Sequence, residues 1–210
     1  MIVENIMNLF KSTVALALSV MSVVNVALAD AVVGNPAPDF TLTDSIGKQH
    51  SLKDFKGKVV VLEWFNPECP FVKKHYKPGA MQASQTKATS EGAVWLTINS
   101  SAEGKQGHLT AEAANKLKDE QKIASTAILF DPEGTVGKAY GAKTTPHMFV
   151  VAADGTLAYA GAIDDTASAD SDDIPNSKNY VMNAVKALAE GKKVEPSSTT
   201  PYGCSVKYKS

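Results

Sequence analysis

One continuous stretch, VVVLEWFNPECPFVKK at residues 59–74, runs from an apolar segment through a short polar turn to a cysteine. The segment Val59–Phe65 is nearly all apolar, which is typical of a β-strand that a parallel sheet buries on both faces. Pro70 suits the first position of a helix, where no backbone N–H is needed, so Cys69 is the predicted N-cap. The unpaired N–H groups and the dipole of a helix N-terminus favour a thiolate over a thiol. The stretch therefore predicts a reactive cysteine between a strand and a helix.

The rest of the chain continues this alternation of strands and helices. A helix is expected from Pro70 to about Lys87, broken or kinked at Pro78. Further strands are expected at 40–43, 93–98, 126–130, 148–152 and 157–160, and further helices at 110–123, 135–140 and 179–189. The turn Ala153–Gly155 makes an antiparallel hairpin of the last two strands. The pattern predicts an α/β fold with a mixed central sheet flanked by helices.

The first 29 residues are expected to be a signal peptide and not part of the fold. Lys11 precedes the apolar run Val14–Val26, and Ala27–Ala29 is an A-x-A cleavage site. Glu4 is unusual in such a leader, so Met7 is an alternative start. The apolar run is short for a bilayer span, although an uncleaved N-terminal anchor is the competing interpretation.

Cleavage before Asp30 leaves residues 30–210, which is enough chain for one well-buried domain in a periplasmic or secreted protein. The net charge of −1 at pH 7 and the lack of a basic stripe argue against nucleic acid as a partner. We also expect no membrane association after cleavage. The two cysteines are Cys69 and Cys204, and a disulfide between them could persist in an oxidising compartment. Whether they are a catalytic pair or a structural clamp stays open.

Four short motifs stand in a fixed order along the chain: PAPDFTL (36–42) with GKVV (57–60), WFNPECP (64–70), Thr145-Pro146, and GCSVKY (203–208). Together they resemble the thioredoxin-fold superfamily, in particular its redoxin branch. That branch includes the peroxiredoxin-like proteins and the alkyl hydroperoxide reductase/thiol-specific antioxidant (AhpC/TSA) family. The resemblance implies a thioredoxin-like fold and a thiol-dependent oxidoreductase without cofactor or metal. Cys69 would be the nucleophile, and Cys204 either the resolving thiol or a permanent partner.

The resemblance also implies roles for five further residues. Glu63 holds the position at which thioredoxins carry a buried carboxylate that shuttles protons; the alternative is a carboxylate that reaches solvent. Thr145-Pro146 matches the loop that presents a cis proline to the nucleophile. With Asn66 and Pro70, these two residues form the predicted substrate-binding set.

Departures from the family pattern bear on the substrate. Position 72 is Val72, so the vicinal dithiol of a thioredoxin is absent. In the P-x-x-x-T-x-x-C turn of a typical peroxiredoxin, Leu62 stands at the proline position and Asn66 at the threonine position, and the chain has no arginine. Lys73 or Lys74 would supply positive charge only as a flexible point charge. We therefore expect thiol-disulfide exchange, with slow peroxide reduction at best.

The remaining expectations concern partners and metals. The expected partners are a protein or small-molecule thiol or disulfide, possible peroxides, and an external reductant. His75 and His147 beside Cys69 could mimic a copper site, but the C-x-x-x-C arrangement is missing, because position 73 is lysine. The acidic loop 164–176 lacks calcium-ligand spacing and is expected to be solvated. We predict no metal and no cofactor.

Overall fold

The computed structural model describes residues 31–210; the predicted leader at residues 1–29 lies outside this range and stays a prediction. The strands are Thr41–Asp44 (β1), Gln49–Ser51 (β2), Val60–Trp64 (β3), Val94–Asn99 (β4), Ala127–Phe130 (β5), Thr144–Thr145 (β6), His147–Val151 (β7), Leu157–Gly161 (β8) and Cys204–Ser205 (β9). The helices are Pro70–Tyr76 (α1), Ala80–Ser90 (α2), Ala111–Glu120 (α3), Thr135–Ala139 (α4) and Tyr180–Ala189 (α5), with 3-10 turns at Leu52–Phe55 and Ser171–Asn176.

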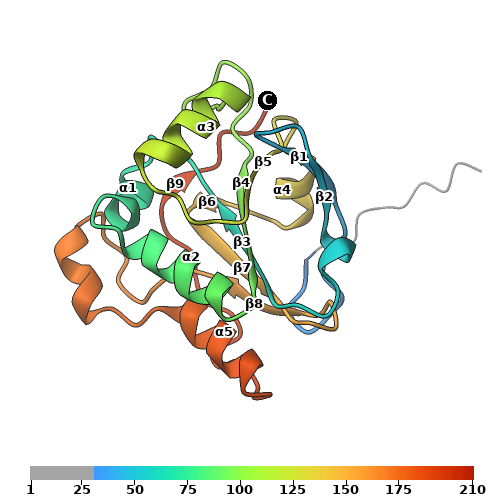
Figure 1. The fold of residues 1–210 in the computed structure, drawn as a ribbon. Coiled ribbons are helices and arrows are strands. Elements are labelled where there is room, and N and C mark those ends of the chain that lie inside the picture. Colours follow the sequence, from blue (N-terminus) through green and yellow to red (C-terminus); the bar gives the residue numbers. More distant parts are fainter. Residues whose placement is uncertain (1–30) are drawn as a thin grey trace, which may run out of the picture.

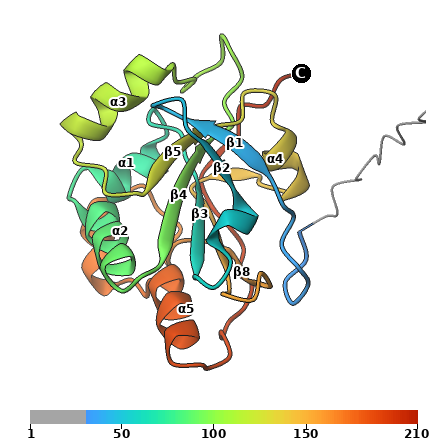
Figure 2. The ribbon, with the colours of Figure 1, turned by 45° about the vertical axis from the view of Figure 1, so that its right-hand side comes forward.

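Seven of the strands form one mixed sheet in the order β2-β1-β5-β4-β3-β7-β8. Strands β3, β4 and β5 are parallel, whereas β7, β8, β1 and β2 pair antiparallel to their neighbours. Figure 2 shows β2, β1, β5, β4 and β3 across the middle of the molecule, with α2 on one side and α4 on the other. The predicted mixed sheet flanked by helices is confirmed.

Alternation along the central strand β3 divides the core into two layers. Val61 and Phe65 face the apolar cluster that α1, α2 and α5 cover, whereas Leu62 and Trp64 face the cluster that includes residues of α4. Because every residue of β3 is buried, neither face is open to water. Figure 1 shows α1, α2 and α5 gathered on one side of the sheet and α4 on the other.

The expected helix from Pro70 to about Lys87 is two helices, as Pro78 suggested. Helix α1 ends at Tyr76, and α2 begins after Gly79, whose φ of 84° lies in the left-handed region. Thr110 caps α3 and Asn179 caps α5, since each side chain accepts a hydrogen bond from the backbone N–H three residues on. None of the helices within residues 31–210 has the length and apolar composition needed to cross a bilayer.

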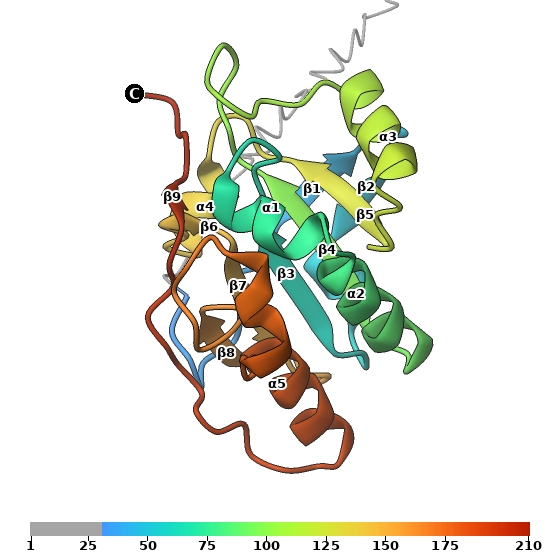
Figure 3. The same cartoon turned by 90° about the vertical axis from the view of Figure 1, so that its left-hand side faces the viewer.

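The C-terminal segment is held against the sheet by backbone hydrogen bonds. After α5 it runs along β8, where Thr199 N–H donates to Ala160 O at 3.2 Å, and then crosses to β6, where Cys204 pairs with Thr145. Figure 3 shows this segment descending from α5 and then rising past β6 to end near α4. The C-terminal segment thus reaches the carboxyl end of β3, close to the turn that contains Cys69.

Candidate active site

Cys69 is the N-cap of α1 and is fully buried, with 0% of its surface exposed. The turn before it is held by Asn66, whose Oδ1 accepts the Glu68 N–H at 2.8 Å. Pro70 occupies the start of the helix, as predicted, where its missing N–H costs nothing. The Cys69 thiol donates to the carbonyl oxygen of Thr145 at 3.0 Å. The strand-to-helix turn therefore aims the sulfur at the loop before β7.

Asn66 also holds the loop that follows β4. Its Nδ2 donates to Gln106 O at 3.1 Å, and Gly107 N–H donates to Glu68 Oε1 at 3.3 Å. A Cβ on Gly107 would lie 2.0 Å from Asn66 Oδ1, so only glycine allows this approach. Asn66 was predicted to bind substrate; in the structure its oxygen and one of its two amide N–H groups are engaged within the protein, which leaves one N–H for a substrate.

The predicted cis peptide Thr145-Pro146 is present. Thr145 lies on β6 directly opposite Cys204 on β9, so this short ribbon brings the two cysteines to one place. Gly203 makes the pairing possible, because its φ is +139° and a Cβ there would lie 2.2 Å from Thr145 O. The buried hydroxyl of Thr145 has no hydrogen-bond partner within residues 31–210. It is therefore available to donate to Cys69 when that thiol ionises.

The two thiols are unbonded in the structure and have opposite pKa shifts. Burial by itself raises the pKa of Cys69, but hydrogen bonds from the Cys204 thiol, from Thr145 and from the backbone N–H groups of Cys204 and Val72 outweigh it, and the net pKa is lowered. Burial and the neighbouring Cys69 raise the pKa of Cys204 to about 11. Cys69 is therefore the thiol that ionises first.

Lysine contributes less to this shift than the sequence suggested. Lys74 was expected to supply positive charge one turn after Cys69, but its buried ammonium lies 3.5 Å from Asp164 Oδ2 and donates to Thr166 O at 2.8 Å. Its charge is therefore balanced by a carboxylate, and no lysine is among the groups that shift the pKa of Cys69. The sequence could not reveal this, because Lys74 and Asp164 are 90 positions apart.

Glu63 is buried, which decides between the two alternatives that the sequence left open. Its Oε1 accepts from Tyr76 Oη at 2.8 Å, and its Oε2 accepts from Trp95 Nε1 at 2.8 Å. Gln85 and Thr97 also donate to Oε2, at 3.2 Å each. Burial raises the pKa of Glu63, although these four donors oppose the shift. Neither cysteine is among the hydrogen-bond partners of Glu63. The described residues therefore contain no direct hydrogen bond through which Glu63 could pass a proton to a thiol.

Sequence reasoning missed the contacts that anchor the cysteine-bearing tail. Tyr202 Oη donates to Asp164 Oδ1, and Lys74 Nζ donates to Tyr202 Oη at 3.5 Å. Tyr208 lies against Gly134 and Gly137 of the α4 region, and its hydroxyl donates to Ala142 O at 2.7 Å. The sequence did contain one indication of these contacts: Tyr202 and Tyr208 lie on either side of Cys204, in a tail of otherwise mostly small and polar residues.

The structure gives no support to a metal site. Within residues 31–210 no three His, Cys, Asp or Glu side chains gather as a metal ion would require. Burial lowers the pKa of His147 to about 4, and its Nδ1 accepts the Lys143 N–H at 3.2 Å. Burial likewise lowers the pKa of His75 to about 4, against the opposing charge of Asp164.

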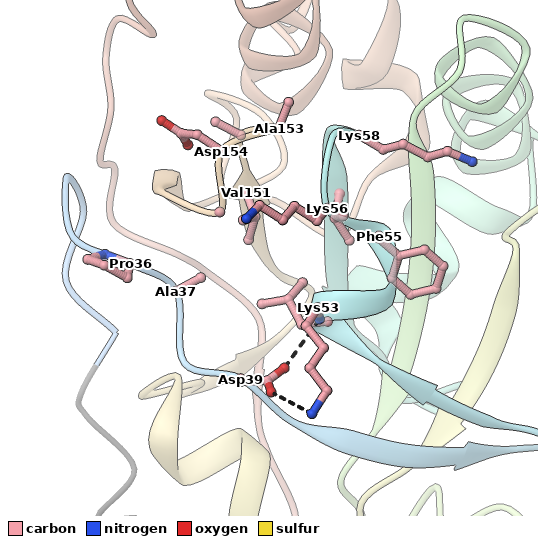
Figure 4. A pocket seen from close by; sticks show the side chains of 14 residues that line it. Pro36, Ala37, Asp39, Lys53, Phe55, Lys56, Lys58, Val151, Ala153 and Asp154 are labelled. Carbon is pink, nitrogen blue, oxygen red and sulfur yellow. Dashed lines mark hydrogen bonds and ion pairs between the residues drawn. The ribbon is translucent and has the colours of Figure 1, made fainter.

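The cavity of about 300 Å³ shown in Figure 4 is not part of this site. It is lined by Phe55, Val60 and three lysines, one of which, Lys53, lies 3.8 Å from Asp39. Val60 is the first residue of β3, whereas Cys69 follows the last one. The cavity therefore lies at the N-terminal end of β3, and the cysteine site lies at its C-terminal end.

Comparison with known proteins agrees with this fold. The model of the AhpC/TSA family matches residues 33–160, more than half of the chain. The thiol-disulfide oxidoreductase ResA of Bacillus thuringiensis subsp. konkukian is 28% identical over 125 residues, which are 60% of this chain and 66% of that protein, just under two thirds of its length.

Two solved structures extend the similarity beyond that region. An uncharacterized conserved protein from Geobacillus kaustophilus is 27% identical, with a TM-score of 0.71 over 85% of this chain and 93% of its own. A hypothetical protein from Sinorhizobium meliloti is 25% identical, with a TM-score of 0.70 over 86% of this chain and 97% of its own. Both alignments cover more of the chain than the family model does.

Proposed function

The chain belongs to the AhpC/TSA family of thioredoxin-like redoxins, and on that premise we propose that it is a thiol-disulfide oxidoreductase with Cys69 as nucleophile and Cys204 as resolving thiol. One observation carries the proposal: the β6–β9 ribbon brings the two thiols together, with the pKa of Cys69 lowered and that of Cys204 raised to about 11. This difference sets the order of attack, because the thiolate is the nucleophile in disulfide exchange.

In the proposed reaction the Cys69 thiolate attacks one sulfur of a disulfide, and the other sulfur leaves as a thiolate that takes a proton from solvent. Cys204 then loses its proton and attacks the Cys69 sulfur, which breaks the mixed disulfide and releases the second substrate thiolate. The substrate disulfide is thereby reduced and the Cys69–Cys204 pair is oxidised. An external thiol reductant supplies the two electrons that reopen the pair.

Hydroperoxides are the second substrate class in the proposal, with slower turnover. Attack of the thiolate breaks the O–O bond, gives a Cys69 sulfenic acid and releases an alkoxide that takes a proton; Cys204 then displaces water. The developing alkoxide needs fixed hydrogen-bond donors, and the loss of one such donor costs about a hundredfold in rate. The chain has no arginine, and one of the two amide N–H groups of Asn66 already donates to Gln106 O. Few fixed donors are therefore left for the alkoxide.

Single-turnover kinetics test this function. Reduced protein should react faster with glutathione disulfide than with hydrogen peroxide, and Cys69→Ser should abolish both reactions. Cys204→Ser should accumulate the mixed disulfide between Cys69 and glutathione, visible by mass spectrometry. A Cys69–Cys204 bond that resists dithiol reductants would instead identify a structural clamp in a non-catalytic binding module.

The proposal extends to partners and location. The similarity to ResA supports protein thiols or disulfides as partners. The leader pattern supports export to the periplasm or beyond, after cleavage between Ala29 and Asp30. Mass spectrometry of the chain from a periplasmic fraction should give a mature N-terminus at Asp30. A full-length chain retained in the membrane would contradict cleavage.

A further inference from the structure

Residues 199–208, which we call the strap, cross the site between two anchors (Figure 3). At one end the Thr199 hydroxyl lies 2.6 Å from Tyr159 Oη and accepts the Ala162 N–H at 2.9 Å. At the other end the Tyr208 hydroxyl donates to Ala142 O. Cys204 lies between these anchors. The strap is therefore the element that holds the second thiol at the site.

A third anchor grips the strap two residues before Cys204. Tyr202 Oη donates to Asp164 Oδ1, and Lys74 Nζ lies 3.5 Å from both the Tyr202 hydroxyl and Asp164 Oδ2. The Tyr202 ring also packs edge-on against Phe71, with centroids 5.9 Å apart, and lies under Lys74 Nζ at 5.5 Å. We call Tyr202, Asp164 and Lys74 the latch. Lys74 and Phe71 belong to α1, so the latch ties the strap to the helix that carries Cys69.

The latch places a buried ion pair against the Tyr202 hydroxyl, which is more than the anchoring of a tail requires. Asp164 and Lys74 are almost fully buried, and a buried ion pair tolerates the loss of a partner poorly. The β6–β9 ribbon beside it has only two residues in each strand, so it contributes few backbone bonds. The hydrogen bonds to charged groups in the latch are stronger than such neutral bonds. Together with the Tyr208 anchor and the backbone bonds of Val206 and Lys207, the latch therefore sets the local cost of lifting the strap.

Lifting the strap has a chemical consequence, because Cys69 has 0% of its surface exposed when the strap is closed. A polypeptide disulfide is too large to reach a buried sulfur, whereas Cys204 on the closed strap is already beside it. The closed and open positions thus serve different steps of the exchange reaction.

Resting on the proposed function, we propose that Tyr202 is a positioning residue that latches the strap over Cys69. The closed strap presents Cys204 for the resolving step and excludes large partners. Its release from Asp164 and Lys74 admits a polypeptide disulfide to Cys69. The latch thereby sets both the access of partners and the effective concentration of Cys204.

The first test measures access with Tyr202→Phe, which removes only the latch hydroxyl. In a Cys204→Ser background, the alkylation rate of Cys69 is measured with iodoacetamide and with a bulky maleimide. The bulky reagent should react about tenfold faster in the variant, since a hydrogen bond to a charged group typically contributes at least that factor. The small reagent should gain less, and so the ratio of the two rates separates opening from a change in thiolate content. Tyr180→Phe, in α5 and outside the latch, is the matched control.

The second test measures effective concentration by equilibrating the Cys69–Cys204 pair with reduced and oxidised glutathione. Tyr202→Phe should lower the equilibrium constant for the internal disulfide by about tenfold, with Tyr180→Phe unchanged. If both measurements stay within about twofold of the unmutated protein, or if Tyr180→Phe matches Tyr202→Phe, the latch does not control the strap.

A third measurement needs no variant. Hydrogen exchange in the unmutated protein should show the Val206 amide, bonded to Lys143 O at 3.1 Å, opening well before β3 and β4. Exchange of Val206 only with global unfolding would overturn the proposal, because the strap would then not move as a unit. None of the three readouts depends on turnover, so the latch can fail while exchange activity persists, and the reverse.

Discussion

Cys69 combines two opposing influences on one sulfur atom. Complete burial disfavours the thiolate, whereas the helix N-terminus and the neighbouring Cys204 favour it, and the net pKa is lowered. The second cysteine is therefore both a resolving thiol in the proposed reaction and part of the reason that the first one ionises.

This double role gives a prediction for the titration of Cys69. Cys204→Ala removes the neighbouring donor, whereas Cys204→Ser keeps a hydroxyl in its place. The midpoint of Cys69 alkylation against pH should therefore lie higher in the alanine variant than in the serine variant, since hydrogen bonds to the thiolate favour it. Equal midpoints would show that the side chain at position 204 does not contribute, and that Thr145 and the backbone N–H groups favour the thiolate without it.

Glu63 gives a second prediction at the scale of one residue. Burial holds its pKa above the ordinary value of 4.5, so the folded protein keeps a proton that the unfolded chain releases. The stability from this proton is fully present below pH 4.5 and is lost as the pH rises through the folded pKa. Glu63→Gln removes this dependence.

The difference in unfolding free energy, unmutated protein minus Glu63→Gln, should thus fall as the pH rises above 4.5, measured by urea unfolding at a series of pH values. Glu112→Gln, on the exposed face of α3, is the control. A difference that does not vary with pH would mean that the pKa of Glu63 is the same in the folded protein as in the unfolded chain.

At the scale of elements, the loop after β4 closes against the turn that carries Cys69. Asn99 Nδ2 donates to Gly107 O at 2.9 Å and to Phe65 O at 3.2 Å, which joins the end of β4 to the end of β3. Gly107 also lies so close to Asn66 that a Cβ on it would be 2.0 Å from Asn66 Oδ1. The position of the Cys69 turn therefore depends on a loop 40 residues further along the chain.

Gly107→Ala tests this closure. Both Gly107 and Gly104 have positive φ, at +77° and +74°, but only a Cβ on Gly107 would collide with Asn66; at Gly104 nothing lies within 4 Å. Both variants should lose about 1 kcal/mol from backbone strain, and Gly107→Ala should lose about 1–3 kcal/mol more in urea unfolding. Equal losses would show that the loop yields to the methyl group freely.

At the scale of the whole molecule, a bond between the thiols would link positions 135 residues apart. Because the strap is already docked in the thiol form, oxidation requires no new fold. The chain-entropy model gives a gain of up to about 5 kcal/mol for a loop of this length.

Oxidation should accordingly raise the urea midpoint of the unmutated protein, whereas Cys204→Ser should have the same midpoint in oxidising and reducing buffer. A lower midpoint after oxidation would mean that the strap must be pulled out of place to form the bond. The gain should also shrink in Tyr202→Phe if the latch holds the strap as proposed.

The sequence by itself determined the parts of the protein that depend on neighbouring residues. The apolar run of β3, the Cys69 cap with Pro70 after it, the break at Pro78 and the hairpin at Gly155 all follow from periodicity and turn chemistry. Motif order identified the fold and the Thr145-Pro146 loop. These features are local, so a short window of sequence contains the interactions that produce them.

Only the tertiary structure decided which distant groups meet. It buried Glu63 among four donors, paired Lys74 with Asp164, and set Cys204 against Thr145 through a ribbon two residues long. Each contact joins segments far apart in the chain, and the register that fixes it arises from packing of the whole sheet. Ion pairs and hydrogen bonds of this kind leave no periodic signal, because a single side chain on each partner suffices to form them.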